Sequence, residues 1–187
     1  MRLGARYGSM STHSTCELSS CPMAIFPIRT FGDPVLRTKA KEIDTIDSGI
    51  RRLADDMIET MYDAPGVGLA APQIGISKQL VVFDIGDGPK VLINPELLET
   101  SGGWIFDEGC LSVPGRFWEI ERPAFARARG LDEHGREVEY AGEELLGRVL
   151  QHEIDHLNGT LLIERLDRRT RKEVLRELRE EALGLGL

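Results

Sequence analysis

The 187-residue sequence predicts an α+β fold, in which small antiparallel sheets pack around a central helix and a further helix ends the chain. Apolar residues recur at helical spacing in residues 47–61 and again after residue 142, and short β-rich runs lie between these two segments. The runs do not alternate regularly with helices, so a doubly wound parallel sheet is not expected. The length is typical of one domain with a substantial core.

The elements can be placed in order from periodicity and from the residues that stop it. The first helix begins at a capping Asp47 or Ser48, and a loop dense in glycine and proline follows it. A Pro95 inside the second β-rich run indicates an edge strand or a bend. The expected elements are a helix at 47–61, a loop at 65–75, strands at 79–85, 91–98 and 104–106, a hairpin formed by 117–129 and 136–141, and helices at 142–158 and 167–183.

The first 22 residues differ from the rest of the chain. They are rich in serine and threonine and show no periodic apolar pattern, so we expect 1–22 to be a disordered N-terminal extension and 23–187 to form a single domain. The extension lacks the apolar core of a secretory signal, although organelle targeting is not excluded. Met10 and Met23 are alternative starts, so the role of the extension is left open.

Composition excludes several classes of protein. The net charge of −8 argues against a nucleic-acid-binding site, and no apolar run reaches the ~20 residues that a membrane helix needs. The three cysteines, Cys16, Cys21 and Cys110, are too few to indicate a disulfide framework and favour a reducing compartment.

The helix at 142–158 carries an unusual pair of histidines. His152 and His156 stand one turn apart, on the stripe that also holds Leu145 and Val149, and Glu153 projects inward beside them. Two imidazoles at this spacing can share a metal while the glutamate stands free as a base. Buried core histidines are the alternative, but a buried carboxylate next to them would then be costly. The opposite, solvent-facing side is expected to hold Gly147, Arg148, Gln151, Asp155 and Asn158.

A catalytic metal usually has three protein ligands and one position open to water, so a third ligand is needed. No histidine follows His156, and Glu164 and Glu173 lie in a charged segment typical of a solvated helix face. His134 falls in an expected surface turn. Cys110 remains, either as a small buried apolar residue or as a thiolate ligand. Taken alone, a site of sulfur and nitrogen donors favours Zn2+.

Three segments, GVGLAAPQIG (66–75), EGCLSVP (108–114) and QHEIDH (151–156), resemble the signature motifs of the peptide deformylase family, in order and at fitting separations. FGDPVLR (31–37) resembles the usual start of that family, and the likeness covers about residues 25–165. The resemblance implies a metal-dependent hydrolase that removes the formyl group from the N-terminal formylmethionine of nascent polypeptides, in the cytoplasm, with 23–187 as its catalytic domain.

The resemblance also implies roles for individual residues. One divalent metal, expected to be Fe2+ physiologically with Zn2+ also found in purified proteins, would be held by Cys110, His152 and His156. Glu153 would act as general base and then acid, and the Gln73 side-chain amide and the Leu111 backbone N–H would stabilise the oxyanion. Glu108 and Arg122 are hypothesised to form an ion pair that holds the Cys110 loop.

Substrate contacts are expected from two observations. Given the family motifs, we expect Val67 and Gly68 of the glycine-rich loop to form main-chain hydrogen bonds with the peptide. Leu145 and Val149 share the helix stripe of the histidines, so we expect them to line the methionine pocket, with Phe106 as a further candidate. The substrate points to the ribosome as a partner for residues 164–181, although the balanced charge of that segment gives this no special support. The alternatives are a zinc endopeptidase with an H-E-x-x-H helix and a structural metal site, which would need a fourth protein ligand.

Overall fold

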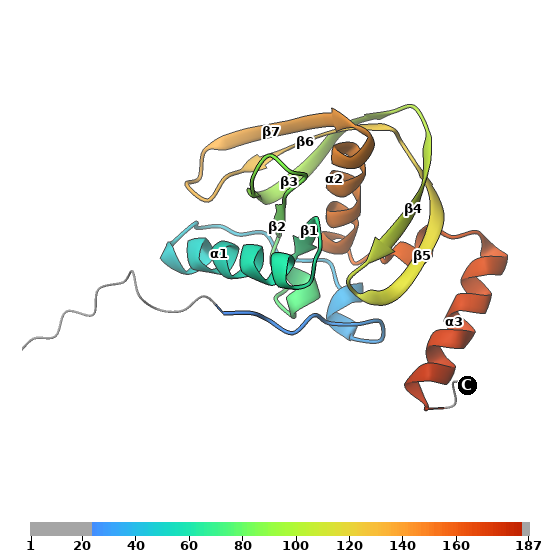
Figure 1. The fold of residues 1–187 in the computed structure, drawn as a ribbon. Coiled ribbons are helices and arrows are strands. Elements are labelled where there is room, and N and C mark those ends of the chain that lie inside the picture. The colour runs from blue at the N-terminus through green and yellow to red at the C-terminus, as the bar shows by residue number, and fades with distance from the viewer. Residues whose placement is uncertain (1–23, 185–187) are drawn as a thin grey trace, which may run out of the picture.

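A computed structural model describes residues 24–184, so the prediction of a disordered extension at 1–22 lies outside the described residues. Strands come mainly between two helices, and a third helix ends the described chain (Figure 1). The elements are η1 (Pro34–Arg37), α1 (Ser48–Asp63), β1 (Gly68–Ala70), η2 (Ala71–Ile74), β2 (Leu80–Phe83), β3 (Lys90–Ser101), β4 (Trp104–Cys110), β5 (Val113–Arg122), β6 (Phe125–Leu131), β7 (Glu137–Glu143), α2 (Glu144–Leu157), η3 (Leu162–Arg165) and α3 (Arg168–Ala182).

The strands form two separate antiparallel sheets. The larger has the order β1-β2-β3-β6-β7, and the smaller is the β4–β5 hairpin. Helix α2 packs against β1, β6 and β7, and it stands between the large sheet and the hairpin in Figure 1. The predicted α+β fold, with small antiparallel sheets around a central helix and a C-terminal helix, is confirmed.

Apolar side chains from both sides of the large sheet fill two core clusters. Met57 and Met61 of α1 pack with one set of strand residues, and Leu150 and Leu157 of α2 pack with Phe83 and the other set. All five side chains are buried, so the sheet is fixed between two helices. Because α2 is held on one side by this core, its other sides are available to build a site.

The helix ends follow the capping signals in the sequence. The Asp47 carboxylate accepts the Ile50 N–H at 2.9 Å and starts α1, and Asp167 starts α3 in the same way. The start of α2 is different, because its N-cap residue makes no side-chain cap bond and Glu144 has a φ of 51°. A non-glycine residue in this left-handed region is strained.

Two of the expected elements differ in the structure, for a physical reason. The predicted hairpin around residues 131–135 is present as β6 and β7, but the run 117–129, expected as one strand, divides at Pro123 into the end of β5 and the start of β6, which belong to different sheets. Proline removes a backbone donor and so interrupts a ladder. The expected loop at 65–75 contains the edge strand β1 and the short helix η2, which glycine and proline signals had hidden.

Pro95 marks a bend and not an edge, because β3 lies between β2 and β6 and its register with β6 shifts around this residue. The neighbouring Asn94 has a φ of 50°, and its side-chain amide bonds both the N–H and the carbonyl of Ile43.

The expected solvent face of α2 was also wrong in part. Arg148 is only 3% exposed, and Gln151 and Gly147 are buried as well. Arg148 pairs with Glu108 of the β4–β5 hairpin, and the Gln151 amide donates to the Pro123 carbonyl at 3.0 Å. The hairpin therefore covers a side of the helix that periodicity alone assigns to water.

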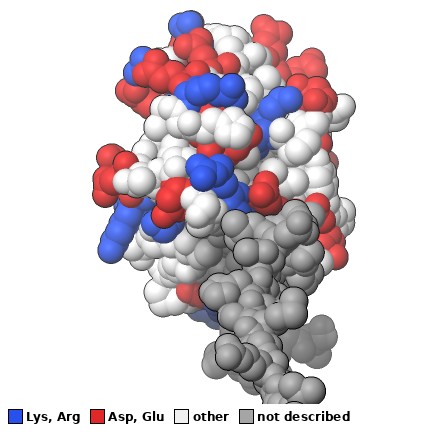
Figure 2. Space-filling view, turned by 90° about the vertical axis from the view of Figure 1, so that its left-hand side faces the viewer, with Lys and Arg blue, Asp and Glu red and all other residues white. Residues whose placement is uncertain are grey.

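Among residues 24–184, no helix is long and apolar enough to span a membrane. On the face shown in Figure 2, acidic and basic side chains lie side by side rather than in one broad basic area. Opposite charges also pair within the large sheet, where Arg127 of β6 pairs with Glu99 of β3 and Glu139 of β7.

Candidate active site

Three potential metal ligands converge between α2 and the hairpin. The Cys110 Sγ lies 3.2 Å from His156 Nε2, which in turn lies 3.2 Å from His152 Nε2. One donor atom from each residue lies within 4.8 Å of the others, and all three residues are buried. This set of one sulfur and two imidazole nitrogens fits a single divalent cation.

Local structure explains why these atoms meet. His152 and His156 are four residues apart on α2, so their rings project from the same side of the helix. Cys110 ends β4, where the register with β5 shifts between Gly109 and Cys110 and Cys110 pairs with Val113. Such an irregularity turns a side chain away from the regular alternation of a strand.

The Cys110 thiol is poised to ionise. Burial raises its pKa, but the neighbouring His156 and His152 outweigh burial, so the pKa of Cys110 lies well below its usual value. The thiolate is the form of cysteine that binds metals. The protein environment therefore favours the ligating form before any cation is considered.

Glu108 orients the first histidine. Its carboxylate lies 2.6 Å from His152 Nδ1, which leaves Nε2 of His152 directed at Cys110 and His156. Although burial raises it, the pKa of Glu108 is held well below its usual value by hydrogen bonds and charge interactions with His152 and Arg122.

Two arginines hold this carboxylate, and only one of them was expected. Arg122 pairs with Glu108 at 2.8 Å, as hypothesised, and also pairs with Asp155 at 2.8 Å. Arg148 forms a second ion pair with Glu108 and donates to the Trp104 carbonyl at 2.7 Å. The position of Arg148 in the sequence did not indicate its ion pair with Glu108, because this pairing depends on how the hairpin folds over α2.

Glu153 lies beside the three potential metal ligands but does not belong to that cluster itself. Its Oε2 is buried and has no hydrogen-bond partner among the described residues. Burial raises its pKa, and charge interactions with His152 and His156 only partly offset this. A carboxyl group with a raised pKa is suited to accept and return a proton near neutral pH.

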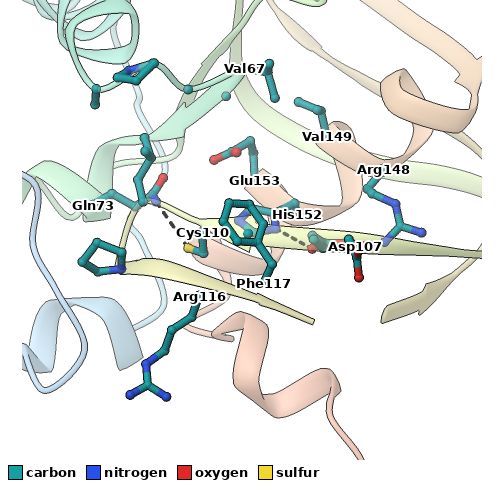
Figure 3. A pocket seen from close by; sticks show the side chains of 18 of the residues that line it. Val67, Gln73, Asp107, Cys110, Arg116, Phe117, Arg148, Val149, His152 and Glu153 are labelled. Carbon is teal, nitrogen blue, oxygen red and sulfur yellow. Dashed lines mark hydrogen bonds and ion pairs between the residues drawn. The ribbon is translucent and has the colours of Figure 1, made fainter. Parts of the chain in front are cut away.

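The Gln73 side chain is fixed by a backbone N–H three residues earlier in the chain. Its Oε1 accepts the Ala70 N–H at 2.8 Å, which directs its NH2 group toward Cys110 Sγ at 3.8 Å (Figure 3). The same NH2 group lies 3.4 Å from Ser112 Oγ. The amide is thus a preset hydrogen-bond donor at the edge of the cluster. Leu111 follows Cys110 directly and lines the same cleft.

An open cleft of about 560 Å³ leads to these residues, a size typical of ligand sites. Five expected substrate contacts line it together with Gln73, Cys110, His152 and Glu153. These are Val67, Gly68, Phe106, Leu145 and Val149.

Sequence reasoning missed one aromatic residue at the mouth of the cleft. Phe117 is 68% exposed, and its ring packs over Gly109, where a Cβ atom would lie 2.5 Å from the ring. An exposed aromatic in a strand has no distinctive local pattern, so nothing in the sequence singled it out.

The pattern of residues agrees with a comparison against known families. The profile of the family described as polypeptide deformylase matches residues 25–172, which is most of the chain. The chain belongs to the polypeptide deformylase family.

Individual relatives and structures support this membership. A peptide deformylase from Clostridium botulinum is 56% identical over 143 residues, covering 76% of this chain and 97% of the relative. One from Alkaliphilus metalliredigens is 57% identical over 144 residues, covering 77% and 98%. The crystal structure of a peptide deformylase from Legionella pneumophila matches with a TM-score of 0.80 and 43% identity, covering 85% of this chain and 96% of that one.

Membership in the deformylase family establishes the activity. The family is metal-dependent and removes the formyl group from nascent peptides, so the predicted function and enzyme class are confirmed. The endopeptidase alternative therefore loses its support. The cluster of Cys110, His152 and His156 fits one metal ion.

Proposed function

We propose that this deformylase holds one divalent metal with Cys110, His152 and His156 and uses Glu153 as its acid–base group. The observation that carries the proposal is the convergence of three donor atoms within 4.8 Å, with the Glu153 Oε2 unpaired beside them. Two imidazoles and one thiolate leave a position for water, as catalytic sites require. A structural site would need a fourth protein ligand.

The proton steps are assigned to Glu153. A metal bound here would make water nucleophilic near neutral pH and polarise the formyl carbonyl. Glu153 takes the proton from the attacking water and later delivers it to the departing amine of the methionine. Its buried, unpaired oxygen and raised pKa both support this exchange.

The developing negative charge on the formyl oxygen needs fixed donors. We assign this to the Gln73 NH2 group and the Leu111 backbone N–H. The Ala70 N–H holds the Gln73 oxygen, so the NH2 group does not need to reorient during the reaction. Leu111 is placed by the irregular end of β4 at Cys110.

The substrate backbone pairs with β1 in this proposal. β1 is an edge strand of the large sheet and, within residues 24–184, pairs only with β2, so its outer side can accept an extended peptide. The Val67 carbonyl already accepts the Asp84 N–H at 3.0 Å, so the pairing uses the Val67 N–H and Gly68. Main-chain pairing tolerates many sequences, which suits an enzyme acting on many nascent chains.

The methionine side chain is assigned to the apolar wall of the cleft. Phe106 and Leu145 are 43% and 38% exposed, while Val149 is buried next to His152. The three residues come from β4 and α2 and line one cleft. Partly exposed apolar side chains around a cleft indicate a binding surface for an apolar group.

The cellular setting is proposed from the family. We expect Fe2+ in the cell and activity with Zn2+ also. We also expect cytoplasmic action on nascent chains, because the deformylases of two bacteria, Clostridium botulinum and Alkaliphilus metalliredigens, are more than half identical to this chain over the matched residues. Residues 23–187 are proposed to act as one catalytic domain.

The ribosome is the proposed partner of residues 164–181, where Arg168 and Arg169 are exposed at the start of α3. If the protein does not bind purified ribosomes at either low or high salt concentration, the ribosome is rejected as that partner.

The test is hydrolysis of a formyl-methionyl peptide by protein purified without oxygen, with the iron and zinc forms compared. Glu153→Gln should retain its metal and lose at least about 100-fold in kcat, which is the low end of general acid–base effects. Cys110→Ala should lose the metal. Glu143→Gln, in the exposed cap of α2, is the matched control. Full activity of Glu153→Gln would reject the proposed role.

A further inference from the structure

An extended segment contacts both parts of the chain that carry the proposed oxyanion donors, the short helix η2 with Gln73 and the turn between β4 and β5 with Leu111. Residues 24–33, which we call the N-terminal strap, run along α1 to η1 and are coloured dark blue in Figure 1. The Ala24 N–H donates to the Asp56 carboxylate at 2.8 Å, and the Phe26 N–H donates to Thr60 Oγ1 at 3.1 Å. These bonds fasten the first part of the strap to α1.

The next part of the strap reaches the site. The Arg29 N–H donates to the Gln73 carbonyl at 2.6 Å, and the Phe31 N–H donates to the Ser112 carbonyl at 2.8 Å. Gln73 and Ser112 also approach each other, since the Gln73 NH2 group lies 3.4 Å from Ser112 Oγ. The four residues therefore form a closed ring of contacts, in which the strap sets the separation of the other two.

We propose that the N-terminal strap, through the backbone N–H groups of Arg29 and Phe31, is a positioning element for the two oxyanion donors. One N–H holds Gln73 itself, and the other holds Ser112, which directly follows Leu111. The inference rests on the proposed roles of Gln73 and Leu111. It adds to them the requirement that a distant segment of the chain keeps both donors at a fixed distance from each other.

The strap is itself anchored where it acts. The Phe31 ring packs in the cluster that includes Leu36 and Val113, and the Arg37 guanidinium lies 5.6 Å from the ring centre. Ser112 is fully buried, so its carbonyl has little access to water and depends on a protein donor. The rigid anchor and the buried acceptor make the Phe31–Ser112 bond a defined link rather than a surface contact.

The kinetic signature follows from what the donors do. Oxyanion donors act on charge that develops in the transition state, so misplacing them lowers kcat and leaves substrate binding nearly unchanged. A strap that only stabilised the fold would change thermal stability without this separation of kcat from KM.

The chain offers a matched pair of variants. Residues 30–33 form a turn closed by the Asp33 N–H and the Thr30 carbonyl at 3.1 Å, and Gly32 has a φ of 106°, which is typical of a type II turn. Phe31 occupies the second position of this turn, where proline is favoured. Phe31→Pro thus fits the turn but lacks the N–H, while Phe31→Ala loses the same ring and keeps the N–H.

With metal-loaded protein well below its unfolding temperature, we expect Phe31→Pro to show about tenfold lower kcat than Phe31→Ala, with KM within about twofold and equal metal content. Equal kcat values in the two variants would overturn the inference, as would a change confined to KM or to metal content. If Phe31→Pro does not fold, Arg29→Pro against Arg29→Ala applies the same criteria to the bond with Gln73.

Gln73→Ala in the parent chain distinguishes failure of the proposed role of Gln73 from failure of the proposed role of the N-terminal strap. A drop in kcat of about 100-fold supports the donor role. If Gln73→Ala is fully active, the proposed function of Gln73 fails. If it is impaired while the proline and alanine variants agree, only the inference about the strap fails.

Discussion

Replacing Gly68 by alanine would place a methyl group against the side chain of Glu153. A Cβ atom at Gly68 would lie 2.9 Å from the carboxyl carbon of Glu153 and 3.0 Å from its Cγ, and closer still to Oε1. Ordinary contact begins at 3.4 Å, so the carboxyl carbon must retreat by about 0.5 Å and the oxygen by more. Both residues are buried, so relief must come from moving Glu153 away from its working position.

The size of the effect follows from that displacement. A misplacement of about 1 Å costs about 100-fold in rate, so Gly68→Ala should lose between about tenfold and 100-fold in kcat. KM should change by less than about threefold, because alanine keeps the backbone groups proposed to pair with the substrate. Steady-state hydrolysis of a formyl-methionyl peptide, together with metal analysis, measures both quantities.

A second glycine supplies the control. A Cβ atom at Gly103 would meet only the Glu121 carboxylate, at 3.4 Å, so Gly103→Ala should retain the parent kcat. The reasoning is refuted if Gly68→Ala keeps full kcat with its metal bound. It is also refuted if the whole loss of activity tracks loss of metal, because Glu153 is not a proposed ligand.

Three further predictions concern stability and metal binding. Glu144→Gly should raise the free energy of unfolding by about 0.5–1 kcal/mol in urea titrations, because it relieves a left-handed φ of 51°, whereas Glu144→Ala should give no gain. Glu108→Gln should weaken metal binding by about 10- to 100-fold in chelator competition, because His152 loses its orienting carboxylate, and unchanged affinity would count against this. The pKa of folded Glu108 is lowered, so its ionised form stabilises the fold above its ordinary pKa of 4.5, and this contribution is lost as the pH falls toward the folded value. The parent chain should therefore lose more Tm than Glu108→Gln between about pH 6 and pH 3, and parallel curves would contradict the assignment.

The parts of the site that depend on short-range spacing could be predicted from the sequence. His152 and His156 are a local pair on one helix, and their inward direction follows from the apolar stripe of α2. The ends of α1 and α3 follow from Asp47 and Asp167 as capping residues. The position of Cys110 depended on the family motifs, because a lone cysteine has no periodic signal.

The parts that depend on distant pairing could not be predicted. Arg148 lies on the polar side of α2, and periodicity assigns such a residue to solvent unless another element covers it. The β4–β5 hairpin supplies that cover, and its first strand also supplies Glu108 as a partner. Likewise, the predicted hairpin is present as β6 and β7, but its first strand does not reach back to residue 117, because Pro123 ends one sheet pairing just before another begins. The individual roles of Glu153, Gln73 and Leu111 stay predictions.

The proposed metal links two parts of the fold that belong to separate sheets. Its sulfur ligand ends the small β4–β5 sheet, whereas both nitrogen ligands come from the helix that packs against the large sheet. A two-stranded sheet has little stability of its own. A cation bound by both the β4–β5 hairpin and α2 would therefore hold the two sides of the cleft together. Removing it should quicken amide hydrogen exchange along the hairpin more than in the large sheet, which makes metal loading a determinant of cleft shape as well as of chemistry.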